Sequence, residues 1–119
     1  MNKEIKIQGI ETNEALDALG IDFSLFKTIL INFIKNNSNS ITLLKEALNN
    51  NDYYQVKEIA HQLKGSSSNI RANNLKKIAM NIELACNDQP LKNQIAEMIE
   101  NLEKEFNIVS LSIESINNQ

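Results

Sequence analysis

Apolar residues recur at intervals of three and four positions along most of the chain, which is the spacing of one face of an α-helix. The pattern covers residues 26–48, 56–70, 75–86 and 91–116, and it is most regular in the last of these stretches. Long helices joined by short polar connections pack with their neighbours antiparallel. The expected fold class is therefore all-α, an up-down antiparallel four-helix bundle with a short additional N-terminal helix.

The segment before the first long helix is expected to be peripheral. Residues 1–11 alternate only weakly between apolar and polar side chains, which predicts an extended lead-in. Thr12 or Asn13 can cap a short helix, and Gly20 suits the left-handed position at its C-terminal end.

The first long apolar stretch contains an interruption. Residues 36–40 read Asn-Asn-Ser-Asn-Ser, which are poor helix formers, but they include neither Gly nor Pro. Residues 22–49 therefore form either one long helix or two. Asp22 or Ser24 can cap the N-terminal end of this stretch.

Polar clusters also predict the later helix boundaries. Asn51 or Asp52 can cap the next long helix, and residues 69–74 form the turn that follows it. Pro90 disfavours helix at the residue before it, so a further helix stops ahead of Pro90.

Composition narrows the class of protein. The 119 residues are enough for one domain, residues 1–119, and the net charge of −3 argues against nucleic acid as a partner. No apolar run approaches the roughly 18–20 residues that a membrane span needs. Cys86 is the only cysteine and His61 the only histidine, so neither an internal disulfide nor a zinc site is expected. The single cysteine fits a reducing compartment, so a cytoplasmic protein is expected. A monomer is also expected, and the start at Met1 favours a free-standing protein.

The single histidine falls on the exposed face of its helix. At about 100° per residue, His61 lies about 140° from the core position Val56, and Gly65 lies about 180° from it. An exposed glycine inside a helix costs about 1 kcal/mol relative to alanine, so it needs a reason. Either the helix ends at Gly65 or a partner approaches its backbone there. Because Ser67 and Ile70 continue the core stripe, the second interpretation is favoured.

Other residues share this face with the histidine. Lys64, one turn away, can offer a positive charge to an anion on the imidazole. Lys57, Lys64 and Arg71 are seven residues apart and form a cationic line if the helix persists, although Lys57 and Arg71 fit a solvated charged edge equally well. Ser68 and Tyr54 lie about 120° and about 160° from the core direction. The candidate partner-binding residues are Lys57, Ser68, Tyr54 and Arg71.

The residue pattern fits one kind of chemistry. The lone histidine lacks the partner cysteine or the serine and orienting acid of a hydrolase, and no Gly-rich phosphate loop is present. The glutamates occur near lysines and are interpreted as solvating surface charges. They are Glu58, Glu83, Glu97 and Glu103. A neutral imidazole has a ring nitrogen free to attack, which suits a covalent phosphoryl carrier. It does not suit an enzyme, because phosphoryl transfer needs metal and charge neutralisation that this chain does not supply.

The motif Ala60-His61-x-Leu63-Lys64-Gly65-Ser66-Ser67 resembles the core motif of histidine-containing phosphotransfer (HPt) domains of bacterial phosphorelays. The similarity extends in both directions and covers roughly residues 9–88. The resemblance implies a four-helix bundle with an exposed histidine.

The resemblance also implies roles for individual residues. His61 would accept and donate the phosphoryl group, Lys64 would help to neutralise it, and Gly65 would give a receiver domain room to dock. The receiver domain would bring the aspartate and Mg²⁺, so no cofactor or metal site of the chain's own is expected. The implied partners are response-regulator receiver domains and a hybrid histidine kinase. Arg71 departs from the family pattern, since many members have glycine there. A non-glycine residue is disfavoured at positive φ, so the turn is expected to be re-routed or the helix to run longer.

Two other functions remain open at this point. A non-catalytic helical module could dock on a receiver or histidine kinase and modulate it without carrying phosphate, although such a protein would more naturally have lost the histidine. The regular stripe of residues 91–116 also permits an assembly or dimerisation unit, but it closes the chain's own bundle more economically.

Overall fold

The computed structural model describes residues 6–117, and six helices hold most of them. The helices are α1 (Thr12–Leu19), α2 (Phe23–Asn37), α3 (Ser40–Asn49), α4 (Tyr53–Asn69), α5 (Asn73–Ala85) and α6 (Lys92–Asn117). Within this part of the chain the one β-type pairing is an isolated bridge between Ile7 and Ile10. The all-α prediction is therefore confirmed.

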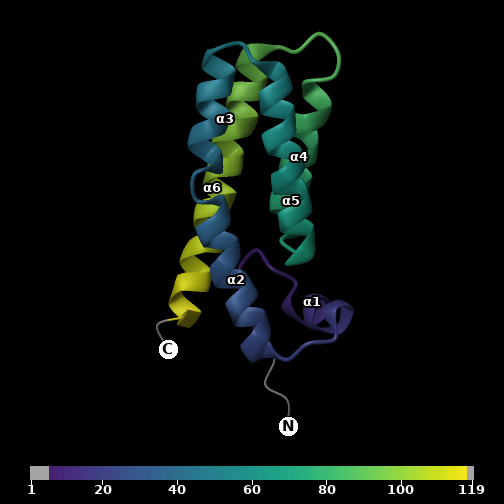
Figure 1. Cartoon of the computed structure of the whole chain (residues 1–119), viewed down its shortest axis with the longest axis vertical. Helices are drawn as coiled ribbons and strands as arrows, with labels where there is room; N and C mark the ends of the chain where they lie inside the picture. Colours follow the sequence, from purple (N-terminus) through teal and green to yellow (C-terminus); the bar gives the residue numbers. More distant parts are fainter. Residues whose placement is uncertain (1–5, 118–119) are drawn as a thin grey trace.

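The helices form an elongated body of 53 × 25 × 18 Å. In Figure 1 the chain rises through α2 and α3, descends through α4, rises through α5 and descends through α6. The long α6 packs against α2, α3 and α5, and α4 packs against α3 and α5. The apolar stripes predicted from the sequence line the core. The largest fully buried side chains are Phe26, Leu30, Leu44, Val56, Leu63, Ile70, Leu75, Ile82, Ile95, Ile99, Leu102 and Ile113.

The stretch 22–49 is two helices. Helix α2 ends at Asn37 and α3 begins at Ser40, so the break falls within the predicted run of poor helix formers. The buried Asn37 side chain turns back and donates from Nδ2 to the Phe33 carbonyl oxygen at 2.9 Å. An asparagine that bonds its own helix in this way competes with continued helix formation.

The N-terminal segment packs into the core, which was not expected. Ile7 and Ile10 are buried in the core, and the Ile10 N–H donates to the Ile7 carbonyl oxygen at 3.0 Å to close a tight turn. Gly9 sits in that turn with φ +86°, against Val109 of α6. The extended lead-in predicted for residues 1–11 is therefore wrong for residues 6–11, because two apolar side chains anchor them. The rest of that stretch, residues 1–5, lies outside the described residues.

Several helix ends follow their predicted signals. Gly20 adopts φ +64° after α1, and the Asp22 and Asp52 carboxylates each accept a hydrogen bond from the backbone N–H three residues later. The N-terminus of α1 differs from the prediction. The cap residue is Glu11, whose side chain makes no capping hydrogen bond. Thr12, which was predicted as a possible cap, is instead the first helical residue.

The turn after α4 contradicts the expectation for Arg71. Its φ is +58°, so the turn keeps the left-handed residue and the helix is not extended. The Arg71 N–H donates to the Ser68 carbonyl oxygen and the Ala72 N–H to the Ser67 carbonyl oxygen, which is the Schellman pattern of helix ends. The left-handed conformation costs an L-residue roughly 1–2 kcal/mol. These bonds, with buried Ile70 and Ala72 on either side, hold the arginine in it.

No helix within residues 6–117 combines the length and the apolar character that crossing a membrane would require.

Candidate functional site

His61 lies in the middle of α4 and points away from the core. Its side chain is 60% exposed, while its neighbour Ala60 and the next core residue Leu63 are fully buried. The orientation predicted from the helical spacing is therefore the observed one. Ser67 is also buried, as expected for a small residue that packs between helices.

A carboxylate from the next helix fixes the imidazole. Glu83 of α5 lies with Oε1 at 2.9 Å from Nδ1 of His61. Because a carboxylate only accepts hydrogen bonds, Nδ1 is the nitrogen that carries the hydrogen. The second ring nitrogen, Nε2, has no hydrogen-bond partner in the described part of the chain and carries the free lone pair. The arrangement thus selects which nitrogen can act as a nucleophile.

Glu83 also binds Lys64. The Lys64 Nζ lies 2.9 Å from Glu83 Oε2, so the two carboxylate oxygens hold two side chains of α4, His61 and Lys64. The Glu83 side chain is only 15% exposed. The hydrogen bond from Lys64 lowers the pKa of Glu83, and His61 adds to this effect, although desolvation opposes it. Glu83 is therefore an ionised member of the site, and its interpretation as a solvating surface charge is wrong.

Sequence reasoning missed Glu83 because its role depends on register between two helices. The residue follows the core residue Ile82 and sits at the edge of the apolar stripe of α5. That edge position is a weak signal, since it also fits a solvated side chain. Only the packing of α4 on α5 brings Glu83 to the imidazole.

Gly65 leaves an open surface one turn after His61. Helix α4 continues to Asn69, so Gly65 does not terminate it. A Cβ atom built on Gly65 would meet nothing within 4 Å. The internal packing therefore does not require glycine here.

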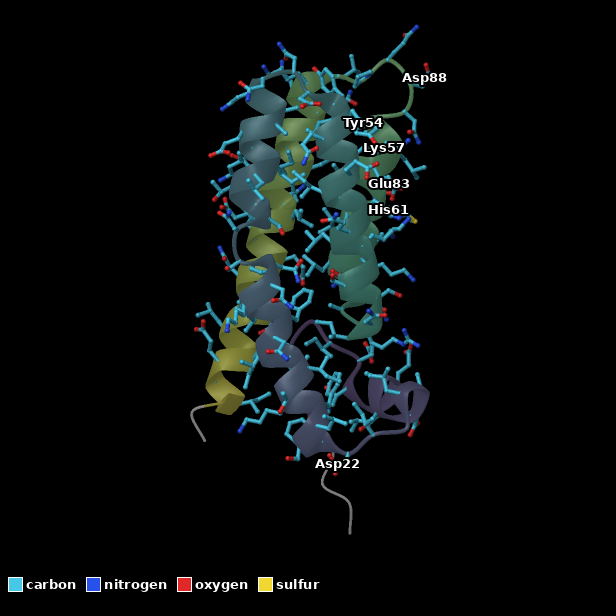
Figure 2. The ribbon with its side chains drawn as sticks, viewed as in Figure 1. Asp22, Tyr54, Lys57, His61, Glu83 and Asp88 are labelled. Carbon is cyan, nitrogen blue, oxygen red and sulfur yellow. The ribbon has the colours of Figure 1, made fainter. Side chains whose placement is uncertain are left out.

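The four candidate partner-binding residues separate into two groups. Figure 2 shows Tyr54, Lys57 and His61 following one another along the same side of the molecule, with Glu83 beside them. Tyr54 is 74% exposed. Ser68 and Arg71 are linked to each other instead, because Arg71 Nη1 donates to the Ser68 carbonyl oxygen at 2.7 Å.

Arg71 does not continue the line of cations on α4. The helix ends before it, and its Nε lies 3.3 Å from the Glu14 carboxylate of α1. The cationic line was predicted only if the helix persists, and because α4 ends at Asn69 it does not extend to Arg71. Arg71 instead joins α1 to the turn after α4, and the Glu11 N–H supports this join by donating to the Arg71 carbonyl oxygen at 3.0 Å.

Two apolar side chains of α5 are exposed close to Glu83 in the sequence. Met80 and Leu84 lie three residues before and one residue after Glu83, and they are 38% and 59% exposed. Exposed side chains of this size beside a reactive group are suited to contact with a partner.

Comparisons with known proteins agree with this geometry. A family model described as Hpt domain matches residues 28–109. The solved structure of histidine-containing phosphotransfer protein B (HptB) from Pseudomonas aeruginosa PAO1 superposes with a TM-score of 0.82. It shares 20% sequence identity, with 95% of this chain and 97% of that chain covered, and at this identity it supports the fold alone. No curated protein sequence matches the chain significantly.

The matched region includes α3, α4 and α5 entire, and thus His61, Lys64, Gly65 and Glu83. On the strength of that match, this chain belongs to the Hpt domain family.

Proposed function

We propose that this chain is a phosphorelay intermediate that accepts a phosphoryl group on His61 from a receiver-domain aspartate and passes it to another receiver domain. Membership of the Hpt family supports histidine phosphotransfer in a phosphorelay. The observation that carries the proposal is the exposed imidazole whose Nδ1 is held by Glu83 while Nε2 is open. The carrier is a single domain, residues 1–119, built as an up-down four-helix bundle.

The reaction proceeds through Nε2. Its lone pair attacks the phosphorus atom of the aspartyl phosphate, the bond from phosphorus to the aspartate oxygen breaks, and that oxygen leaves with the electron pair. The reverse steps pass the group to a second aspartate. Glu83 orients the ring for both directions, because its bond to Nδ1 fixes the tautomer in which Nε2 is nucleophilic.

Lys64 neutralises charge on the phosphoryl group. Its Nζ lies one helical turn from the imidazole and contacts Glu83 Oε2 at 2.9 Å in the resting protein. A dianionic phosphoryl group on Nε2 offers a competing acceptor with more charge. Lys64 therefore turns from Glu83 toward the phosphoryl oxygens when the group arrives.

The rest of the catalytic machinery belongs to the partner. Phosphoryl transfer needs a metal ion near the transferring oxygens, and the receiver domain supplies Mg²⁺ together with the aspartate. The chain is therefore a carrier and not an enzyme. Its partners are response-regulator receiver domains and a hybrid histidine kinase.

The docking surface surrounds His61. Gly65 gives the receiver access to the imidazole, since it leaves the helix surface open. Tyr54, Lys57 and Ser68 border this surface on α4, and Arg71 extends it at the turn that follows. The exposed Met80 and Leu84 extend it across α5.

The test is transfer from receiver domains phosphorylated on aspartate. The expected result is label on the chain that is labile in acid and stable in base, with none on the His61→Gln variant. Receiver binding by His61→Gln, measured in parallel, separates a defect in transfer from a defect in docking. Absence of label on the wild-type chain, or full labelling of His61→Gln, would overturn the proposal.

A further inference from the structure

The Nδ1 proton of His61 can stay on the ring or leave it once Nε2 is phosphorylated. When neutral His61 attacks through Nε2, the ring gains a bond to phosphorus while Nδ1 still carries its hydrogen. The immediate product is therefore a phosphoimidazolium, in which the ring is cationic and the phosphoryl group stays anionic. The ring either keeps the Nδ1 proton or releases it and becomes neutral.

The contact with Glu83 distinguishes these two outcomes. Without its hydrogen, Nδ1 would turn a lone pair toward Glu83 Oε1 at 2.9 Å, with no proton between two acceptors. With the hydrogen kept, the same contact is a charge-assisted bond between an imidazolium and a carboxylate. The carboxylate has little room to turn away, because the Glu83 side chain is only 15% exposed.

The remaining charges near the ring do not reverse this preference. Lys57 and Glu58 precede His61 by one turn on α4 and carry opposite charges. Helix α3 also packs on α4, and its Lys45 is paired with Glu103 of α6 at 3.0 Å. Once Lys64 turns toward the phosphoryl group, Glu83 loses a neutralising partner and attracts the imidazolium more strongly.

We propose that Glu83 keeps the Nδ1 proton on the ring while Nε2 carries the phosphoryl group, so that the carrier form is a phosphoimidazolium. This inference rests on the proposed function for its place in a relay. The imidazole ring of His61 then carries its Nδ1 hydrogen before, during and after transfer. When the second aspartate attacks phosphorus, the nitrogen–phosphorus bond breaks, its electron pair returns to Nε2, and the neutral Nδ1–H imidazole is restored. A protonated ring is the better leaving group, so Glu83 makes His61 a strong phosphoryl donor as well as an acceptor.

The experiment uses the whole chain and needs no receiver domain. Phosphoramidate, a small phosphoryl donor, phosphorylates the chain, and nitrogen-15 NMR follows the ring nitrogens of its single histidine as the pH is raised. In the wild type, Nδ1 keeps its hydrogen at and above neutral pH. In Glu83→Gln, the pH of half-loss falls by about 1 unit or more, since an adjacent opposite charge is removed.

Glu103→Gln is the matched control. It removes the same charge from another ion pair, with Lys45, and should leave the wild-type NMR titration unchanged. Far-UV circular dichroism, which reports helix content, checks that each variant is folded.

The outcomes distinguish the retained Nδ1 proton from the carrier function. If the wild type loses the Nδ1 proton at the same pH as Glu83→Gln, the inference is wrong while the carrier function stands. If phosphoramidate labels His61 with its Nδ1 proton kept but no receiver does, the carrier function fails and the inference stands. Failure of phosphoramidate to label His61 would also overturn the inference, since Nε2 would then not be an available nucleophile.

Discussion

At the scale of single residues, Glu83 joins the two side chains to which the proposed function assigns the nucleophile and the neutralising charge. Its two oxygens hold His61 Nδ1 and Lys64 Nζ, each at 2.9 Å. One carboxylate therefore sets the tautomer of the nucleophile and the resting position of the cation. Neither α4 nor α5 could do this alone, because the three residues come from both helices.

The lowered pKa of Glu83 predicts how stability depends on pH. Lys64 is the main cause of the lower pKa, so the ionised carboxylate is favoured in the folded state. This stabilisation is fully present above the ordinary carboxyl value of 4.5 and is lost as the pH falls through the lowered pKa. Thermal melts of wild type and Glu83→Gln should differ above pH 4.5 and converge in more acidic solution. A constant difference at all pH values would contradict the ion pair.

Gly65 predicts opposite effects on stability and on transfer. Gly65→Ala should stabilise the helix by about 1 kcal/mol, because Ala suits a helix interior and its Cβ meets nothing within 4 Å. Gly65→Gln should also fold but should slow transfer from a receiver at least about tenfold by blocking its approach. Chemical denaturation and transfer kinetics on both variants test this prediction. Unchanged transfer by Gly65→Gln would show that no partner approaches there.

At the scale of elements, the turn between α4 and α5 connects the site to α1. Arg71 takes a left-handed conformation there, and its side chain reaches the Ser68 carbonyl oxygen and the Glu14 carboxylate. At Arg71 the left-handed backbone therefore destabilises the folded state, while the side-chain contacts stabilise it.

Two substitutions separate these effects. Both Arg71→Ala and Arg71→Gly remove the side-chain contacts, but only glycine adopts positive φ without strain. Arg71→Gly should therefore be more stable than Arg71→Ala by about 1 kcal/mol in denaturant unfolding. Equal stabilities would mean that the turn in solution does not hold the left-handed conformation.

The elements were predictable from the sequence to different degrees. The helical stripes, the exposed His61 and the caps at Asp22 and Asp52 follow from periodicity and local hydrogen bonding, so local sequence suffices for them. The conformation of Arg71 was not predictable, because hydrogen bonds and packing from both sides outweigh its local preference. Glu83 was missed for a related reason, since its partners lie on another helix.

At the scale of the whole molecule, the N-terminal turn packs against the long helix α6. Gly9 lies against α6, and a Cβ on it would come within 2.7 Å of Val109 Cγ2. Its φ of +86° is also unfavourable for any other residue. The lead-in predicted to be extended is thus part of the packed structure from residue 6 onward.

This packing predicts a difference between two glycines. Gly20 also has positive φ, but a Cβ there would meet nothing within 4 Å. Gly20→Ala should therefore cost about 1 kcal/mol for conformation alone. Gly9→Ala should cost about 2–3 kcal/mol, since the clash with Val109 adds to the strain. Denaturant midpoints of the two variants test this, and equal costs would mean that the N-terminal turn does not pack on α6.

A two-step relay tests directly whether the chain carries a phosphoryl group between two receiver domains. The chain is labelled on His61 by one phosphorylated receiver domain, purified from it, and mixed with a second, unphosphorylated receiver domain and Mg²⁺. We expect that label leaves His61 and appears on the second receiver, with none passing through the His61→Gln variant. Label that stays on the chain, or that is released only as inorganic phosphate, would contradict its role as a carrier.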